Sequence, residues 1–413
     1  MPAAEIAPSP ARSRGRPAAA ASVWIAAAGA IGYAAFALQG GRHLALYAVA
    51  LAMGAVLLHT GFGFTGSLRR FVLEREARAL RAPLALIALT TLALAPALAI
   101  GEAFGQPLGP AAAPVAMQVA IGAMLFGIGM QLGGGCGSGT LFSLGGGNGR
   151  MLVVVLFFCA GSFLASLHMG WWASLPAADP IVLGELLGWP QAALLQVAAI
   201  AALWWGLGRA ARPAARASPA SPLQSPLQSP LQSPLQSPSQ SPLQSALQSA
   251  LRSPLWIGAV ALAALNLATL LLAGHPWSIT WAYALWGAKA AVQLGWDPAS
   301  SAFWQAPFQS AALSSGILDD VTSLMDIGLV LGAGGAALAA GRWSLRIDRR
   351  PGALLAAVLG GLLMGYGARI GFGCTIGALV SGIASTSVHG WLWFAAVLPG
   401  TWLGGRLRPH FGL

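Results

Sequence analysis

Apolar runs long enough to cross a lipid bilayer recur along this chain of 413 residues. Only 8% of its residues are charged, whereas ordinary soluble domains carry about 25%. So few charges could not cover the surface of a water-soluble fold, and a run of roughly 20 apolar residues matches the hydrocarbon thickness of a membrane. The pattern therefore predicts an all-α polytopic membrane protein.

The predicted spans share an apolar composition and roughly the length of one crossing. They are Val23 to Gln39, Leu44 to Leu58, Ala82 to Gly101, Pro114 to Leu132, Met151 to Leu167, Gln191 to Gly208, Leu255 to Ala273, Ile279 to Leu294, Val321 to Ala340, Ala353 to Arg369 and Gly390 to Leu403. Ser301 to Leu318, rich in polar and small side chains, is a weaker candidate. The count predicts about eleven or twelve crossings, with membrane lipid around them.

Residues 213–254 contain eight successive four-residue units, five of which read SPLQ. Proline at this density removes backbone donors and favours an extended chain, so these residues predict a disordered tether outside the bilayer. The tether divides the chain into a cytoplasmic tail at 1–22, a first transmembrane half at 23–212 and a second half at 255–413.

The arginines predict the orientation, because cytoplasmic loops of membrane proteins carry an excess of Lys and Arg. They flank apolar segments and form no patch interleaved with aromatic residues, so the net charge of +11 does not indicate a nucleic-acid partner. With a cytoplasmic N-terminus, the arginines at 69–81, Arg150 and the tether all lie inside. The arginines at 342–350 also lie inside if Ser301 to Leu318 crosses or nearly crosses.

Two segments of the chain resemble each other and carry matching cysteines. Gly127 to Phe142 reads GIGMQLGGGCGSGTLF and Gly365 to Val380 reads GYGARIGFGCTIGALV, which aligns Cys136 with Cys374. Both are too rich in glycine and hydroxyl groups for ordinary spans, and non-helical backbone at membrane depth survives only inside protein or beside a wet cavity. We expect two re-entrant segments, the first opening inside and the second outside, in two inverted halves that form an hourglass pathway.

The residues around each cysteine indicate an anion site. A short helix beginning just after each cysteine would direct free N–H groups and the positive end of its dipole at the constriction. Gly135, Gly137 and Gly373 flank the two cysteines and are predicted to line the pathway with them. The hydroxyl groups of Ser138, Thr140 and Thr375 would add donors. A neutral thiol with a polarizable sulfur suits a guest that itself carries sulfur.

Four other residues lie in or near the predicted spans and segments, and two of them, Arg369 and Phe64, allow two interpretations each. Gln131 and Arg369 lie five residues before Cys136 and Cys374, and Arg369 would either attract the anion or pair with a carboxylate or a carbonyl group. Phe64, in the related segment HTGFGFTGSL, occupies the place of a cysteine and would narrow the pathway or fill a gap by packing. The third cysteine, Cys159, stands alone in a span and is expected to be a core residue.

Three acidic residues and two histidines are further candidates for a site. Asp319, Asp320 and Asp326 fall near the outer start of a span, where a cation or the N-terminus of a helix would satisfy them. His59 and His389 lack the companions that a metal site requires. We therefore expect no metal and no other cofactor.

At these segments the chain resembles the YeeE/YedE family of membrane proteins, which are taken to be sulfur transporters. The resemblance rests on GIGMQLGGGCGSGTL and on ARIGFGCTIGALVSGIASTSVHGW, and more weakly on GFGFTGSLRR and SGILDDVTSLMDIG. It covers both halves and leaves out the N-terminal tail and the SPLQ tether.

The resemblance implies uptake of thiosulfate across a bacterial inner membrane, with cysteines lining the path and passing the ion along by S–H···S contacts. Carried over by position, Cys136 and Cys374 match two of the three cysteines of such proteins, and the third falls at Phe64. Relatives linked to selenium leave a selenium oxyanion open as the substrate.

The leading hypothesis is a transporter of thiosulfate or a similar small sulfur anion, and not an enzyme. No G-x-x-x-x-G-K-[ST] loop is present, so energy would come from a gradient or from a cytoplasmic sulfurtransferase that traps the product. The alternative is a membrane-embedded sulfurtransferase that carries sulfur on a cysteine, although no His or Lys is paired with either cysteine in the sequence.

Overall fold

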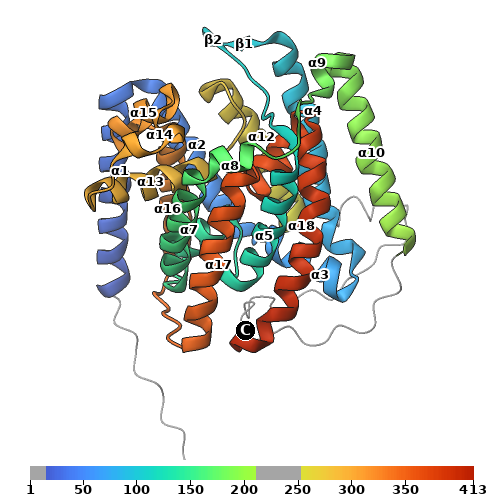
Figure 1. Cartoon of the computed structure of the whole chain (residues 1–413). Helices are drawn as coiled ribbons and strands as arrows, with labels where there is room; N and C mark the ends of the chain where they lie inside the picture. The colour runs from blue at the N-terminus through green and yellow to red at the C-terminus, as the bar shows by residue number, and fades with distance from the viewer. Residues whose placement is uncertain (1–14, 211–252) are drawn as a thin grey trace, which may run out of the picture.

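The computed structural model describes residues 15–210 and 253–413, and long helices lying side by side make up most of them (Figure 1). The long helices are α1 (Gly15–Gln39), α2 (Gly41–Thr60), α4 (Arg81–Ile100), α5 (Met117–Gly133), α7 (Arg150–Leu167), α10 (Trp189–Ala210), α12 (Pro254–Ala273), α16 (Val321–Ala339), α17 (Pro351–Ile370) and α18 (Val388–Leu407). The first helix begins before the predicted start at Val23. The predictions for the tail and the SPLQ tether fall mostly outside the described residues.

Short helices and strands connect the long helices. The short helices are α3 (Phe64–Glu74), η1 (Ala77–Leu80), α6 (Gly137–Gly145), α8 (Met169–Ala173), α9 (Leu183–Leu187), α13 (Thr280–Gln293), η2 (Pro298–Ser300), α14 (Ala302–Gln305), α15 (Pro307–Ser314), η3 (Ile317–Asp319), η4 (Thr375–Gly382) and η5 (Arg408–Phe411). Strands β1 (Glu102–Ala103) and β2 (Gln106–Pro107) pair antiparallel, as do β3 (Pro114–Ala116) and β4 (Ala177–Pro180).

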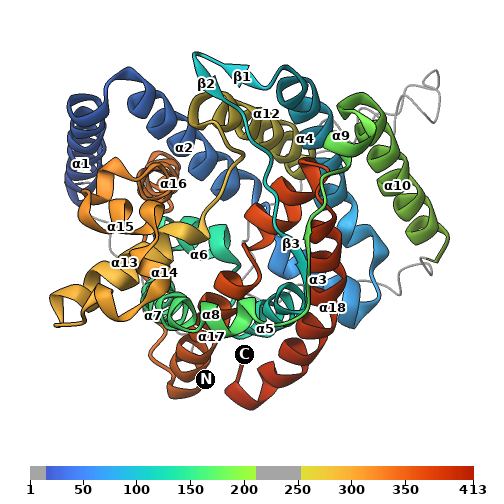
Figure 2. The ribbon, with the colours of Figure 1, turned by 45° about the horizontal axis from the view of Figure 1, so that its top comes forward.

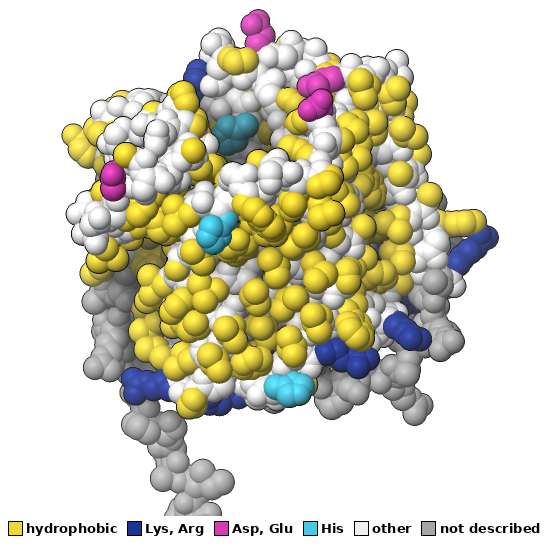
Figure 3. Space-filling view, in the orientation of Figure 1, with side chains coloured by type: hydrophobic (Ala, Val, Ile, Leu, Met, Phe, Trp, Pro, Cys, Tyr) yellow, Lys and Arg dark blue, Asp and Glu magenta, His cyan; other side chains and the backbone are white. Residues whose placement is uncertain are grey.

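The outer surface of the helices suits contact with lipid. Within residues 15–210 and 253–413, nine segments are long and apolar enough to cross a bilayer. Hydrophobic side chains cover the face between the two ends, while most basic side chains gather at the lower end and the acidic ones at the upper end (Figure 3). So large an apolar surface is rare on proteins in water. The chain is an all-α polytopic membrane protein, as predicted, with fewer candidate spans than the roughly eleven or twelve expected.

The segment after α12 is not a crossing, contrary to the prediction for Ile279 to Leu294. The chain turns inward after Gly274, and Trp277 and Ile279 are buried, with exposed fractions of 1% and 0%. Helix α13 has only 14 residues. Near its other end the Nζ of Lys289 donates to the carbonyl oxygens of Leu313 and Ser315, in the group of short helices at the upper end of the molecule (Figure 1). Helix α13 is therefore a half-helix that returns to the end from which the chain came.

The weaker candidate span, Ser301 to Leu318, does not cross either. It forms the short helices α14, α15 and η3, which lie at the same end as the start of α16 (Figures 1 and 2). A run with so many polar and small residues cannot provide the continuous apolar helix that a bilayer requires. Because neither segment crosses, α16 still brings the arginines after it to the lower end, by a route different from the predicted one.

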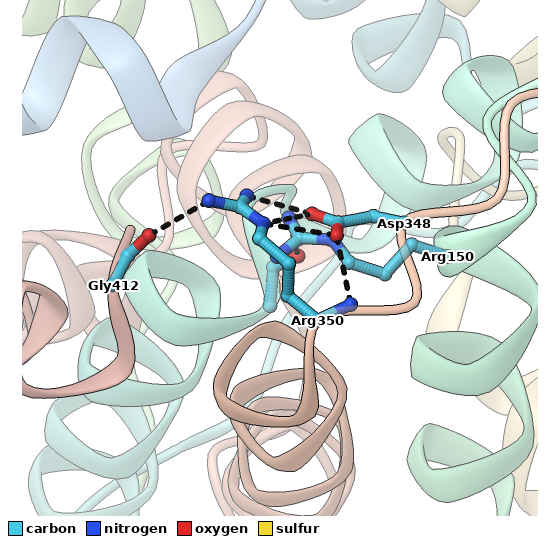
Figure 4. A network of polar contacts seen from close by, with 5 residues as sticks. Arg150, Asp348, Arg350 and Gly412 are labelled. Atoms are coloured by element: carbon cyan, nitrogen blue, oxygen red, sulfur yellow. Dashed lines mark hydrogen bonds and ion pairs between the residues drawn. The ribbon is translucent and has the colours of Figure 1, made fainter.

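Contacts between loops and helix ends hold the basic end together. The N–H of Gly149 donates to the carbonyl oxygen of Arg346 at 2.8 Å. Asp348 forms a 2.7 Å ion pair with Arg350, whose Nη1 also donates to the carbonyl oxygen of Gly412, as Figure 4 shows. The pKa of Asp348 falls from 3.8 to about 2, chiefly because Arg350 donates hydrogen bonds to the carboxylate. This end also carries Arg150, beside the same carboxylate (Figure 4).

The two predicted halves are interleaved. Helix α5 packs on α17 and α18, α2 on α16, α4 on α12, and α7 on α17, so most long helices of the first half contact helices of the second. Between α5 and α17 the backbones touch: a Cβ on Gly129 would lie 2.6 Å from the backbone nitrogen of Met364, and one on Gly367 would lie 2.5 Å from the carbonyl oxygen of Gly122. The inverted relation of the halves remains a prediction.

Candidate functional site

The two cysteine segments meet inside the protein. A Cβ on Gly137, the residue after Cys136, would lie 3.0 Å from the Sγ of Cys374. Both cysteines are buried, with exposed fractions of 1% and 0%, and both belong to one continuous apolar core. Figure 2 shows α6, which follows Cys136, enclosed by α2, α16, α7 and the red segment before α18. The sequence repeat thus identifies two segments that lie together.

The first segment turns sharply before a short α-helix. Gly134 adopts a φ of 85°, a left-handed conformation that a residue without a side chain adopts at little cost, and it ends α5. Cys136 precedes α6, and its Sγ lies 3.5 Å from the Oγ of Ser138. No side chain caps this helix. The N–H groups of its first turn therefore stay available near the thiol.

The second segment is built differently, although its sequence is similar. Phe372 and Gly373 have φ values of 54° and 146°, and the helix that follows Cys374, η4, is a π-helix. The carbonyl oxygen of Cys374 accepts from the N–H of Ala378 at 2.9 Å and that of Leu379 at 3.3 Å. Its Sγ accepts from the N–H of Ile376 at 3.4 Å. Sulfur thus replaces the usual oxygen as the cap of this helix.

The N-terminal ends of α6 and η4 therefore lie against each other. Gly137 is the first residue of α6, and Cys374, which it approaches, is the residue before η4. Each helix N-terminus carries a partial positive charge from its free N–H groups. Two positive ends in contact repel each other, and an anion between them would be stabilised by both.

Tyr283 supports the first segment, and the sequence analysis did not identify it. Its hydroxyl donates to the carbonyl oxygen of Gly137 at 3.1 Å and lies 3.0 Å from the Oγ1 of Thr140. The ring stacks on Phe158, with centroids 4.0 Å apart. Thr140 itself donates to the carbonyl oxygen of Gly137 at 2.7 Å, so its hydroxyl holds the turn and is not a free donor as expected.

A second set of contacts supports η4. The Oγ of Ser381 donates to the carbonyl oxygen of Trp277 at 2.8 Å, and the N–H of Trp277 donates to the Oδ1 of Asn266 at 2.9 Å. Asn266 lies on α12 and donates in turn to Ser381 at 3.3 Å. The inward turn between α12 and α13 thus holds both segments, since Tyr283 follows it directly. The sequence offers one signal for this turn: Gly274 and Pro276 interrupt the chain just before the short apolar run that begins at Ile279.

The remaining predicted site residues take different places. The Oγ1 of Thr375 is buried and has no hydrogen-bond partner among the described residues. Gln131 donates to the carbonyl oxygen of Thr65 at 3.1 Å and so links α5 to α3. Phe64, 2% exposed, packs edge-on against Phe62 in the same core as both cysteines. Of Thr375, Gln131 and Phe64, only Thr375 has a hydrogen-bond donor without a partner among the described residues.

Arg369 does not pair with a carboxylate in the described part of the chain. Its guanidinium carbon lies 5.9 Å from the ring centre of Trp281 and 5.3 Å from that of Phe303, which are cation–π distances. Trp281 in turn donates to Asp320 at 3.0 Å. Arg369 therefore lies among the aromatic side chains near the acidic end. A recess opens at that end, with a histidine side chain inside it (Figure 3).

The three aspartates near the start of α16 differ from one another. Asp320 caps the helix, because its carboxylate accepts from the N–H of Ser323 at 2.7 Å. Asp319 accepts from the N–H of Gly316 at 2.8 Å. Both satisfy the expected capping role, whereas Asp326 lies 0% exposed inside the protein, and neither carboxylate oxygen has a partner among the described residues. The expectation was wrong for Asp326, because it lies more than one turn into the helix.

Comparisons with known proteins agree with the sequence resemblance. A family model described as sulphur transport matches residues 59–403. The chain is 29% identical over 154 residues to "Probable transporter YedE" of Escherichia coli (strain K12), a match that covers 37% of each chain. It is 40% identical over 76 residues to "Thiosulfate transporter TsuA" of Spirochaeta thermophila, which covers 18% of this chain and 23% of that protein. The chain thus spans less than half the length of the curated relatives it matches.

Proposed function

The chain belongs to the sulphur transport family, and on that premise we propose that it carries thiosulfate, or a related small sulfur anion, across the bacterial inner membrane through the contact between Cys136 and Cys374. The observation that carries this proposal is the meeting of two helix N-termini at two thiols. Similarity to a named thiosulfate transporter supports the choice of substrate.

The chemistry of the contact suits such an anion. The oxygen atoms of thiosulfate accept hydrogen bonds from the free N–H groups at the start of α6 and from the unpartnered hydroxyl of Thr375. The thiols of Cys136 and Cys374 contact the terminal sulfur, where a neutral, polarizable group binds without adding negative charge. The ion exchanges its water for these donors as it passes, so it is held without being trapped.

The path that we propose is an hourglass with the cysteines at its narrowest part. By the excess of arginines, the basic end faces the cytoplasm and the acidic end faces outward. Phe64 stands where relatives of this type have a third cysteine, so this chain uses two thiol contacts and a shorter relay. A cytoplasmic sulfurtransferase that consumes the ion would make uptake one-directional.

Uptake of radiolabelled thiosulfate into liposomes containing the purified protein tests this function. Cys136→Ala and Cys374→Ala should each lower the initial rate about tenfold or more, since a hydrogen bond to a charged group contributes about 1.5–3 kcal/mol. The matched control is Cys159→Ala on α7, a thiol outside the contact, which should stay close to wild type.

Two results would contradict the proposal. Wild-type protein that takes up no thiosulfate, sulfite or selenite in this assay is not a transporter of these anions. A covalent sulfur adduct on Cys136 or Cys374, found by mass spectrometry after exposure to thiosulfate, would instead favour the sulfurtransferase that the sequence left open.

A further inference from the structure

Asp326 is a carboxyl group inside the membrane-spanning part of the protein without a partner. It has an exposed fraction of 0%, and both its Oδ atoms lack a hydrogen-bond partner among the described residues. The described residues form two ion pairs, Arg70 with Glu76 and Arg350 with Asp348, and neither includes Asp326. A buried ionised carboxylate without a cation is far more costly than a neutral carboxyl group. An ionisable residue at such a position usually has a functional role.

The helix turns Asp326 toward the cysteine contact. Residues three and four apart lie on one face of a helix. Three residues before Asp326, the hydroxyl of Ser323 accepts from Trp286 of α13 at 2.9 Å. Four residues after it, the carbonyl oxygen of Val330 lies against Gly145 of α6. Asp326 therefore faces α13 and α6, the two helices whose contact holds the turn at Cys136.

The titratable groups around Asp326 are neutral or acidic. Those in electrostatic contact with it are Tyr283 on α13, Cys159 on α7, Cys374 before η4 and Asp320 at the start of α16. Helix α6 contributes no titratable side chain.

Helices α1 and α2 pack on the other face of α16, where the ring of Tyr47 lies against Gly328 and its hydroxyl donates to the carbonyl oxygen of Ala28. No group of three His, Cys, Asp or Glu residues in the described chain could hold a metal ion. Divalent cations such as Ca²⁺ take six or more oxygen ligands, so a lone carboxyl group among thiols and a phenol suits a proton better.

We propose that Asp326 is a proton-binding site that couples passage of the anion at Cys136 and Cys374 to movement of protons in the same direction. This inference rests on the proposed function. The carboxyl group takes up a proton from water on the outer side and releases it to water on the cytoplasmic side, and no other bond is made or broken. A bound proton removes the negative charge of Asp326 while the anion is close to it.

Coupling of this kind answers an electrostatic problem. A membrane potential that is negative inside opposes inward movement of any anion. A carboxylate beside the path would oppose it further, because like charges repel more strongly where water is excluded. Protonation of Asp326 removes the repulsion between its carboxylate and the anion. A proton that moves with the anion also reduces the net negative charge that crosses against the membrane potential. Uptake then depends on the proton gradient.

The test uses liposomes that contain the purified full chain and an internal pH-sensitive dye, with the membrane potential clamped by potassium and valinomycin. With wild-type protein, an outside medium more acidic than the inside should accelerate thiosulfate uptake, and added thiosulfate should acidify the interior. Asp326→Asn should lose both responses while it still exchanges labelled for unlabelled thiosulfate. Asp326→Glu, which keeps the carboxyl group, should retain them.

Asp297→Asn is the matched control, because it makes the same substitution at an exposed aspartate that caps the short helix η2. It should respond as wild type does. Wild-type protein that exchanges thiosulfate but shows neither response overturns the proposal, and so does stimulation by sodium in place of protons or an unchanged response in Asp326→Asn. If Asp326→Asn does not fold, the wild-type measurements decide alone. Absence of any exchange by wild type would instead defeat the proposed function.

Discussion

The segments around Cys136 and Cys374 have matching sequences but differ in backbone. The first leads into an α-helix that no side chain caps, whereas the second leads into a π-helix whose cap is the cysteine sulfur itself. Left-handed φ values also differ: Gly134 alone carries one in the first turn, and both Phe372 and Gly373 do in the second.

The repeated sequence determines where the thiols lie, whereas contacts from distant parts of the chain determine the backbone conformation of each segment. The glycine and cysteine pattern places a thiol at the start of each short helix. The contacts around each helix come from distant parts of the chain, with Tyr283 on one side and Trp277 and Asn266 on the other. Wider π-type turns are frequent at functional sites. The second segment is the more strained of the two, because a non-glycine residue, Phe372, has a left-handed φ there beside Gly373. Variants of Gly137, Gly373 and Tyr283 test how the two segments differ, and a variant of Asp348 provides a reference outside both.

The largest effect is expected where the segments touch. Gly137→Val would place branched methyl groups beyond a Cβ that already lies 3.0 Å from the Sγ of Cys374. Overpacking of this kind costs about 1–3 kcal/mol, and because it falls on the proposed constriction, uptake of thiosulfate should drop by at least about tenfold. The matched control is Gly377→Ala, whose Cβ would meet nothing closer than 3.8 Å. Equal uptake by both variants would show that the contact is not on the path.

The glycines that precede the two cysteines offer the next test. Gly373→Ala should destabilise the protein by about 1–3 kcal/mol, the usual cost of forcing a side chain into a disfavoured backbone region. Its φ is 146°, and the new Cβ would lie 2.7 Å from the backbone nitrogen of Ala378. Gly135→Ala, with no left-handed φ and a nearest atom at 3.0 Å, should cost less. Thermal unfolding in detergent measures both, and a reversed order would contradict the strain assigned to the second segment.

A smaller effect is expected from the hydroxyl that holds the first segment. Tyr283→Phe removes the donor to the carbonyl oxygen of Gly137 but keeps the ring stacked on Phe158. The loss should be about 0.5–1.5 kcal/mol of unfolding free energy, typical of one hydrogen bond. Thiosulfate uptake should fall as well, because the turn beside Cys136 loosens. Unchanged stability together with unchanged uptake would mean that the segment needs no such support.

The smallest effect should come from the basic end, far from either segment. Folding lowers the pKa of Asp348 from 3.8 to about 2. Its pairing with Arg350 therefore stabilises the folded state in full at any pH well above 3.8, the pKa of the unfolded chain. That contribution is lost as the pH falls through the folded value. Asp348→Asn should therefore lower stability by less than about 1 kcal/mol at neutral pH and by nothing in strong acid. Melting temperatures over this pH range measure it, and a difference that persists in acid would contradict the assignment.

The sequence was sufficient to predict the helical membrane architecture and the two segments that meet. Hydrophobicity sets the spans, and the repeated glycines mark the places where backbone replaces side chains, as around Cys136 and Cys374. It was not sufficient for α13, because a short apolar run has the same composition whether it crosses or turns back. Nor did it reveal Tyr283, which contacts a carbonyl group 146 positions earlier in the chain. Such a contact depends on how distant helices pack, which no local pattern records.

Asp326 shows a similar limit. Its neighbours in the sequence, Asp319 and Asp320, are ordinary capping residues, and composition alone groups the three together. Six residues after the cap, the helix has already carried Asp326 into the interior. The inverted relation of the halves remains a prediction, and so does the use of the thiols by a substrate, which the uptake measurements on Cys136→Ala and Cys374→Ala test.

The glycine contact between α5 and α17 limits how the protein can change shape. Where main chains touch directly, no rotamers can rearrange to absorb a tilt, and van der Waals attraction is lost as soon as the helices separate. A rocking mechanism, in which one helix bundle rotates against another, would have to break the contact between α5 and α17. Gating should instead involve small displacements of α13 and the two short helices within a rigid frame.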